Sequence, residues 1–157
     1  MSVSGISLKR VIILTVKLYY DSEWLISSEA YEIYKDCMYR PVYEKYLRET
    51  RNFADDDDIY VFVCVDNSQN VGMLVVRMKD GGEGEIIGIA VKPEYRRNGA
   101  GAYLIKESAK MMNIKKLTAQ TDGDTVMFYK ALGFECKPQT VKYPDGICER
   151  FNCEKIV

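Results

Sequence analysis

Apolar and polar positions follow each other along the chain in two patterns, one typical of strands and one typical of helices. Short runs rich in β-branched residues, each bounded by turn residues, predict strands. Apolar residues that recur every three or four positions predict helices. The predicted strands cover residues 11–18, 59–65, 71–78, 83–91, 116–120, 134–143 and 149–157. The predicted helices cover residues 22–34, a segment that begins at Pro41, and residues 99–112 and 124–132.

The connections between these segments predict how the sheet is built. Tight turns join the strands at 59–65, 71–78 and 83–91, so these three are expected to form an antiparallel meander. Helical segments separate most of the other strands. The order β-α-α-β-β-β-α-β-α-β-β predicts an α/β fold, with a central mixed, largely antiparallel sheet flanked by helices.

The length and composition predict one folded domain. The chain has 157 residues, of which 47% are apolar and 29% charged, which suits a globular protein with a core and excludes a disordered one. No repeat or linker divides it. We expect residues 1–10, which are rich in serine, to form a loosely ordered lead-in, and residues 11–157 to form a single domain.

The charge balance and the lack of histidine exclude several functions. Lys and Arg total 22 against 23 Asp and Glu, a net charge of −1, whereas binders of nucleic acid or anionic membranes carry a basic excess. A chain without histidine has no Ser-His-Asp triad, no Cys-His dyad and no histidine-ligated metal. No metal is therefore expected, and a general acid or base must be Asp, Glu, Tyr, Cys or Lys.

The cysteines and the N-terminal segment indicate a cytoplasmic protein. The five cysteines are odd in number and lack Cys-x-x-Cys spacing, which favours small buried residues in a reducing compartment over a disulfide framework or a zinc site. Lys9 and Arg10 precede an apolar run, a pattern that weakly resembles a signal peptide. Lys17 interrupts that run and no small-residue cleavage site follows, so we interpret it as a strand.

One segment, residues 85–101, combines features of an anion-binding site. A buried strand runs into a loop stopped by a proline, and the loop opens a helix with two glycines and two arginines. Backbone N–H groups at a helix N-terminus bind anions, and glycine lets phosphate oxygens approach the backbone. Arg96 and Arg97 would add charge-assisted contacts. On glycine spacing alone, a plain glycine-rich helix cap is an equally good interpretation.

Two common nucleotide-binding motifs do not fit this loop. A Walker loop requires Lys-Ser/Thr after its glycines, and none follows here. The dinucleotide fingerprint Gly-x-Gly-x-x-Gly fails at its third glycine, where the chain has Leu104. The glycines also follow an antiparallel meander rather than a parallel βαβ unit. The sequence therefore argues against both nucleotide-binding interpretations.

The same residues resemble a family motif. Arg96-x-x-Gly99-x-Gly101, after the strand that ends at Val91, resembles the acetyl-CoA motif of the GNAT superfamily of N-acyltransferases, Arg/Gln-x-x-Gly-x-Gly/Ala. A second stretch, from Asp122 to Phe134, is similar to the family's later segment Asn-x-x-Ala-x-x-Phe-Tyr-x-x-x-Gly-Phe, with Asp and Thr where Asn and Ala are usual. The predicted order of elements is also the family's own.

The resemblance implies a binding site for acetyl-CoA, used as a co-substrate. It implies that strand residues pair with the pantetheine arm and that amides of the loop and helix bind the pyrophosphate. The residues implied in cofactor binding are Ile89, Ala90, Val91, Arg96, Arg97, Asn98, Gly99, Ala100, Gly101, Ala102, Asp122 and Phe128.

Two residues are candidates for catalysis. Tyr129 stands at a motif position, and because a phenol titrates at about 10 and a thiol at roughly 8.5, it would be protonated and able to donate to the departing thiolate. A packed aromatic is the alternative. Glu85 is a candidate base, since strand alternation places Glu85, Ile87 and Ile89 on one face, although an exposed position is equally well supported. The backbone N–H of Ile89 is a candidate oxyanion donor.

The implied function is N-acetyl transfer from acetyl-CoA to a primary amine, on a small molecule or peptide, by direct transfer in a ternary complex. The alternative is a non-catalytic acyl-CoA-binding or sensing module of the same fold. Sheet edges and the last hairpin offer surfaces for a homodimer, while nucleic acid and membranes are not expected as partners.

The acidic run 55–58 is a candidate cation site or, more simply, a solvated loop. Aromatic residues before it would line an amine pocket or fill the core: Trp24, Tyr31, Tyr34, Tyr39, Tyr43 and Tyr46.

Overall fold

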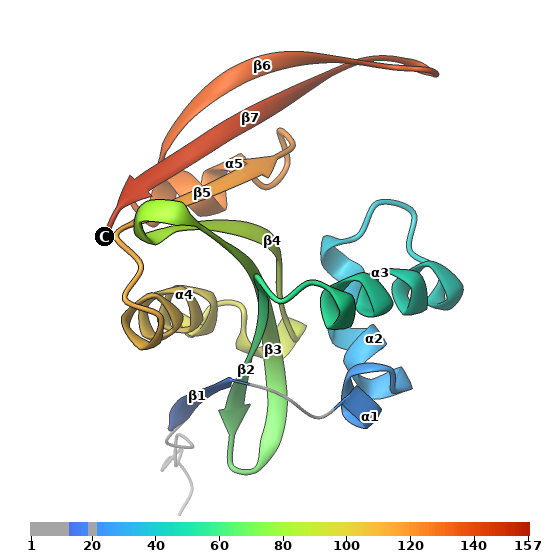
Figure 1. Ribbon diagram of the computed structural model, residues 1–157, viewed down its shortest axis with the longest axis vertical. Helices are drawn as coiled ribbons and strands as arrows, with labels where there is room; N and C mark the ends of the chain where they lie inside the picture. Colours follow the sequence, from blue (N-terminus) through green and yellow to red (C-terminus); the bar gives the residue numbers. More distant parts are fainter. Residues whose placement is uncertain (1–12, 19–21) are drawn as a thin grey trace, which may run out of the picture.

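A seven-stranded mixed sheet forms the centre of the protein. The computed structural model describes residues 13–18 and 22–157, and its strands lie in the order β1-β2-β3-β4-β5-β7-β6 (Figure 1). All neighbouring strands are antiparallel except β4 and β5. The strands are β1 (Leu14–Leu18), β2 (Ile59–Asp66), β3 (Gln69–Lys79), β4 (Glu83–Val91), β5 (Lys116–Thr121), β6 (Glu135–Tyr143) and β7 (Gly146–Ile156). The predicted α/β fold is confirmed; the lead-in at 1–10 and the start of the first predicted strand lie outside the described residues.

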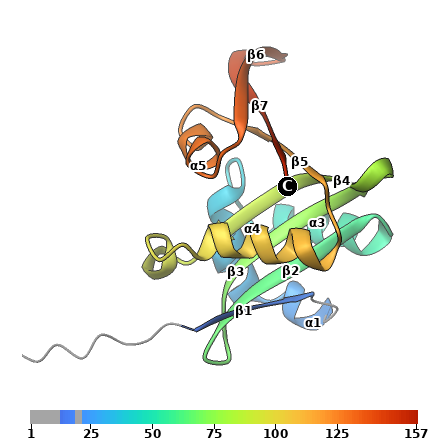
Figure 2. The ribbon, with the colours of Figure 1, turned by 90° about the vertical axis from the view of Figure 1, so that its left-hand side faces the viewer.

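Helices cover both faces of the sheet (Figures 1 and 2). The α-helices are α1 (Ser22–Leu25), α2 (Ser28–Tyr34), α3 (Tyr43–Asp55), α4 (Ala100–Met111) and α5 (Val126–Ala131). Short 3₁₀ turns are η1 (Lys35–Cys37), η2 (Asp80–Gly82) and η3 (Pro93–Tyr95). The single helix expected at 22–34 is two helices, because Ser27 ends the first turn and caps the second through the Ala30 amide at 3.2 Å. No helix of the described part of the chain is long and apolar enough to cross a membrane.

The core has two parts, one on each side of the meander. On one face α4 packs on β1 to β4 and α5 packs on β6 and β7, with Phe62, Leu74 and Leu104 almost completely buried. On the other face α2 and α3 pack on β2 to β4 through Ile33, Tyr46 and Met73. Because β2 and β3 are covered on both faces, they are nearly continuous apolar runs rather than alternating ones.

The acidic run after α3 forms a solvated turn. The Asp58 amide donates to the Asp56 carboxylate at 2.9 Å, and the Met78 amide donates to the Asp58 carbonyl at 2.7 Å. Asp56 also forms an ion pair with Arg77 at 3.5 Å. No group of residues suited to hold a metal ion occurs in the described ranges.

A β-bulge in β4 changes which side chains share a face. Val75 pairs with Gly88 and Val76 pairs with Ile86, so Ile87 has no partner on β3. Glu85, before the bulge, lies with Arg77 on the α3 side, whereas Ile89, after it, packs on the α4 side. The expectation that Glu85, Ile87 and Ile89 share one face is therefore wrong, because the extra residue shifts the alternation by one.

β4 and β5, the parallel pair among the described strands, separate halfway along the length of β4. β4 and β5 pair from Glu83 opposite Lys116 to Ile86 opposite Ala119, and no pairing continues beyond. The helix α4 is the connection between them, as a parallel pair requires. The second half of β4, residues 87–91, therefore has no strand neighbour on the β5 side.

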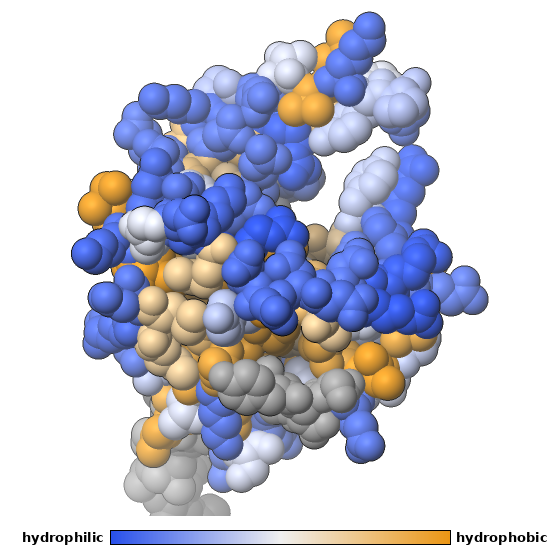
Figure 3. Space-filling model, viewed as in Figure 1, coloured by the Kyte–Doolittle hydropathy of each residue, from blue (hydrophilic) through white to orange (hydrophobic). Residues whose placement is uncertain are grey.

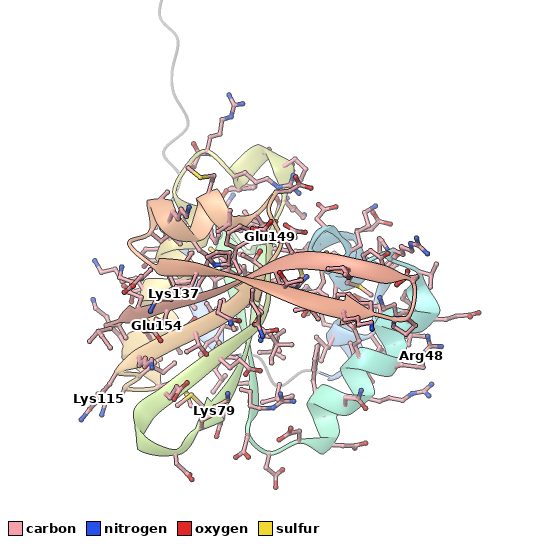
Figure 4. All side chains as sticks on the ribbon, turned by 90° about the horizontal axis from the view of Figure 1, so that it is seen from above. Arg48, Lys79, Lys115, Lys137, Glu149 and Glu154 are labelled. Atoms are coloured by element: carbon pink, nitrogen blue, oxygen red, sulfur yellow. The ribbon has the colours of Figure 1, made fainter. Side chains whose placement is uncertain are left out.

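The hairpin of β6 and β7 extends away from the sheet. Its base pairs with β5, and its outer half reaches over towards α3 (Figures 1 and 4). Seen from above, Lys137 and Glu154 lie near the base, while Arg48 lies on α3 (Figure 4). Most side chains of the outer half are exposed, and the space-filling view shows a hollow between the hairpin tip and the helices (Figure 3).

Candidate active site

The first turn of α4 presents free backbone amides beside the end of β4. Gly99 stands before the helix in the left-handed region, with φ 73° and ψ 15°, a conformation that favours glycine. The first intrahelical bond runs from the Tyr103 amide to the Gly99 carbonyl at 2.9 Å. The amides of Ala100, Gly101 and Ala102 have no acceptor among the described residues, as at any helix N-terminus. The positive end of the helix dipole adds to this anion-binding potential.

The two motif segments meet at Gly101. A Cβ on Gly101 would lie 3.1 and 3.2 Å from ring atoms of Phe128, so the α5 aromatic ring packs closely on the first turn of α4. Phe128 is half-buried and extends the core of that face. The structure thus brings together two cofactor-binding candidates that lie far apart in the sequence.

Arg96 contacts protein groups on two sides of the loop. Its Nε donates to the Val91 carbonyl at 2.9 Å, and its Nη2 forms an ion pair with Asp36 of η1. The side chain therefore joins the end of β4 to the segment that follows α2. Arg97 is exposed and has no ion pair in the described part of the chain, so its guanidinium is available to an anion.

A buried hydrogen bond anchors the turn before the loop. The Tyr95 hydroxyl donates to the Asp66 carboxylate at the end of β2, and the two residues are 5% and 2% exposed. The Lys92 amide donates to the Val71 carbonyl at 2.8 Å in the same region. The sequence analysis did not identify Asp66. The feature that could have indicated it is an acidic residue at the end of an otherwise apolar strand.

Asp122 caps the turn that leads into α5. Its Oδ1 accepts the Thr125 amide at 2.9 Å, and its carbonyl accepts the Val126 amide at 3.1 Å. An asparagine would make the same side-chain contact, so this departure from the family pattern preserves the local backbone. Asp122 and Thr125 are both exposed, next to Phe128 in the sequence.

Tyr129 is a buried phenol on α5, the helix that packs on β6 and β7. Its ring is 4% exposed and stands edge-to-face with Phe128 and Phe134, at centroid distances of 5.1 and 5.2 Å. Burial raises the pKa of Tyr129 above its ordinary value of 10.0, with smaller contributions from Cys37, Cys153 and Cys136. The phenol is therefore protonated at neutral pH. Its hydroxyl has no hydrogen-bond partner among the described residues.

Tyr34 reaches the bulge in β4 from the opposite face. A Cβ on Gly88 would overlap the Tyr34 hydroxyl and lie 2.7 Å from its Cζ, so only glycine fits there. Burial raises the pKa of Tyr34 well above its ordinary value. No sequence motif predicts this contact, which depends on how α2 crosses β4.

Glu85 lines a polar cleft under the hairpin. The cleft has a volume of about 530 Å³ and lies between β4, β5 and the base of β6 and β7. Glu85 is paired with Lys79 at 2.9 Å and with Arg77 at 3.5 Å, and its side chain is 33% exposed. The carboxylate does reach a cleft, but two cations hold it there. The Glu85 carboxylate in turn raises the pKa of Lys79.

Most of the aromatic residues on α1 to α3 belong to the core. Tyr46 is fully buried and lies 5.6 Å from Tyr31 and 5.8 Å from Tyr34, measured between ring centroids. Tyr39 and Tyr43 are the exposed ones, at 69% and 40%. Arg40 lies over the Tyr39 ring at 5.1 Å. Tyr39 and Tyr43 therefore offer the most exposed aromatic surface of this region, while Trp24 and Tyr31 are half-buried.

Comparisons with known proteins point to one family. The family model described as acetyltransferase (GNAT) family matches residues 27–134. No curated protein sequence matches the chain. Solved structures share its fold at low sequence identity. An aminoglycoside 6′-acetyltransferase type Ii is 15% identical, with a TM-score of 0.72 over 90% of this chain and 96% of that one.

Two further structures are similar over nearly their whole length. The ribosomal-protein-S18-alanine N-acetyltransferase from Escherichia coli is 16% identical, with a TM-score of 0.68 over 92% of this chain and 94% of that one. A GNAT family acetyltransferase from Elizabethkingia anophelis, solved with acetyl-CoA bound, is 18% identical, with a TM-score of 0.65 over 92% and 98%. At such identities the likeness shows the fold.

Proposed function

The chain belongs to the GNAT family of acetyltransferases, and on that basis we propose that it transfers the acetyl group of acetyl-CoA to a primary amine. The amine belongs to a small molecule or a peptide, and transfer is direct, within a ternary complex. The observation that supports this proposal is that free α4 amides follow a half of β4 with no β5 neighbour, while Phe128, whose ring contacts Tyr129, packs on the first turn of α4.

Acetyl-CoA would lie along the separated strands. The backbone of Ile89, Ala90 and Val91 would take the pantetheine arm in place of the missing β5 neighbour, as an added strand does. The amides from Gly99 to Ala102 would take the pyrophosphate, with Arg97 as a charged contact. The thioester would then lie beside α5.

The transfer requires three groups of the chain. Tyr129, protonated at neutral pH, would donate to the departing thiolate. The Ile89 amide, on the side of β4 that lacks a partner, would stabilise the oxyanion. Glu85 would accept the proton of the amine, either after release from Lys79 or through water in the cleft.

The alternative is a non-catalytic acyl-CoA-binding or sensing module. One observation favours it: the Glu85 carboxylate is engaged in ion pairs with Lys79 and Arg77 rather than free to contact an amine. The two functions share the cofactor site and differ only in turnover.

The deciding experiment measures thiol release from acetyl-CoA over a panel of amines, together with calorimetric titration of CoA. Turnover with any amine supports the enzyme, and CoA binding without turnover across the panel supports the module. Gly101→Val should abolish CoA binding, because the added side chain meets Phe128, whereas Gly123→Ala, whose Cβ would lie 4.0 Å from the nearest atom, should bind normally. Absence of CoA binding in the native protein would overturn both functions.

A further inference from the structure

Two cysteines on the two strands of the last hairpin lie directly opposite each other. The register of the hairpin pairs Cys136 of β6 with Cys153 of β7, and both are free thiols. Residues directly opposite in an antiparallel pair have Cα atoms about 4.5–5.5 Å apart and side chains on the same face. A disulfide requires Cα atoms roughly 4.4–6.8 Å apart. The pair is therefore within bonding reach without a change of the backbone.

The surroundings give the two thiols different access to solvent. Cys153 is 2% exposed and lies between Cys136 and Ala119 of β5, whereas Cys136 is half-buried. Burial raises the pKa of the Cys153 thiol to about 12. Both side chains pack into the core of the face that holds Tyr129. A reagent in solution therefore reaches Cys136 first.

We propose that Cys136 and Cys153 form a reversible disulfide by exchange with a low-molecular-weight disulfide such as oxidised glutathione. The Cys136 thiolate attacks one glutathione sulfur, and the first glutathione leaves as a thiolate. The Cys153 thiolate then attacks the Cys136 sulfur of the mixed disulfide and releases the second glutathione. Two protein thiols are oxidised, one small disulfide is reduced to two thiols, and these carry away the two protons.

The bond would fix the base of the hairpin. Residue 136 is the second residue of β6, and residue 153 lies near the end of β7, within the part of the hairpin where β7 pairs with β5. The cross-link would join the two strands beneath α5, next to the Tyr129 ring. Oxidation is thus a modification of the wall of the candidate active site.

The test uses a variant in which the two exposed cysteines, Cys37 and Cys148, are replaced by serine, so that they form no adducts. After incubation with oxidised glutathione, intact mass and peptide mapping should show an internal Cys136–Cys153 disulfide that dithiothreitol reverses. The melting temperature should rise by roughly 6–12 °C, because the bond constrains the unfolded chain. The further variant Cys153→Ala should stop at a glutathione adduct on Cys136.

Two results would overturn the proposal. One is a protein that keeps both thiols free after long incubation; the other is a stable glutathione adduct on Cys136 while Cys153 is present and free. None of these readouts uses acetyl-CoA or an amine. The outcome therefore stands whether or not the proposed acetyl transfer is found.

Discussion

At the scale of single residues, burial decides which protonation state Tyr129 can offer. The phenol has almost no contact with solvent, so its ionised form is disfavoured and its proton is retained through the neutral range. A retained proton suits a donor to a thiolate, which has an ordinary pKa of roughly 8.5. The same burial would suit a residue that only packs, and turnover separates the two roles.

Tyr129→Phe should therefore lower turnover by about 10²- to 10⁴-fold and leave CoA affinity nearly unchanged, since only the hydroxyl is lost. Steady-state kinetics and calorimetry measure the two quantities. Tyr143→Phe, on the exposed end of the hairpin, is the matched control and should change neither. Unchanged turnover in Tyr129→Phe would remove this residue from the chemistry.

Gly88 is a second residue whose identity is set by a neighbour. Gly88→Ala should destabilise the fold by roughly 1–3 kcal/mol, because the new methyl group overlaps the Tyr34 side chain. Denaturant unfolding measures the loss, and Gly123→Ala provides a control in open space. Adding Tyr34→Phe should recover part of the loss, whereas equal destabilisation by both glycine variants would show that the overlap is not the cause.

At the scale of elements, Arg96 joins the cofactor loop to the helical region on the other face. Its ion pair with Asp36 is half-exposed, with side chains 48% and 42% accessible, so it contributes little to overall stability. Its structural effect is to connect the end of β4 with η1.

A double-mutant cycle with Arg96→Gln and Asp36→Asn should give a coupling energy of about 0.2–1 kcal/mol in thermal or denaturant unfolding. High salt should reduce it, because exposed charges are screened. Strictly additive effects at low salt would show that the two side chains do not pair in solution.

The elements themselves were largely predictable, because each carries a local signal. The glycines around α4, the proline before it and the apolar runs of the meander all act within a few residues. The bulge at Ile87 depends on which strand lies alongside, and the Cys136–Cys153 register depends on the exact residues of the hairpin turn; neither is predicted by the apolar pattern alone. The ion pair between Arg96 and Asp36 likewise depends on how two segments far apart in the sequence pack together. The homodimer, the cytoplasmic location and the site assignments stay predictions.

At the scale of the whole molecule, buried phenols and thiols set the response to pH. Burial raises the pKa of Tyr34, Tyr46 and Tyr129, and it raises the pKa of Cys64 to about 11 and of Cys153 to about 12. The unfolded chain releases these protons near the ordinary values of 9.0 and 10.0, while the folded chain retains them. The contribution of these groups to the free energy of unfolding is complete below about pH 9, and it is lost as the pH rises towards the raised pKa values.

The melting temperature should therefore stay nearly constant from about pH 7 to 8.5 and fall steadily above about pH 9. Thermal unfolding followed by circular dichroism over this range measures it. Tyr34→Phe removes one buried phenol and should make the alkaline decline shallower. A melting temperature that rises above pH 10 would contradict the assigned directions.

The early end of the β4–β5 pairing also has a consequence for the exchange of amide hydrogens with solvent. On β4 beyond Ile86, every second amide points away from β3 and finds no carbonyl on β5. Such amides exchange quickly in deuterated water, while their neighbours, bonded to β3, exchange slowly. A ligand laid along this edge would slow the fast set alone. The position of the cofactor would then appear as an alternating pattern of protection within a single strand.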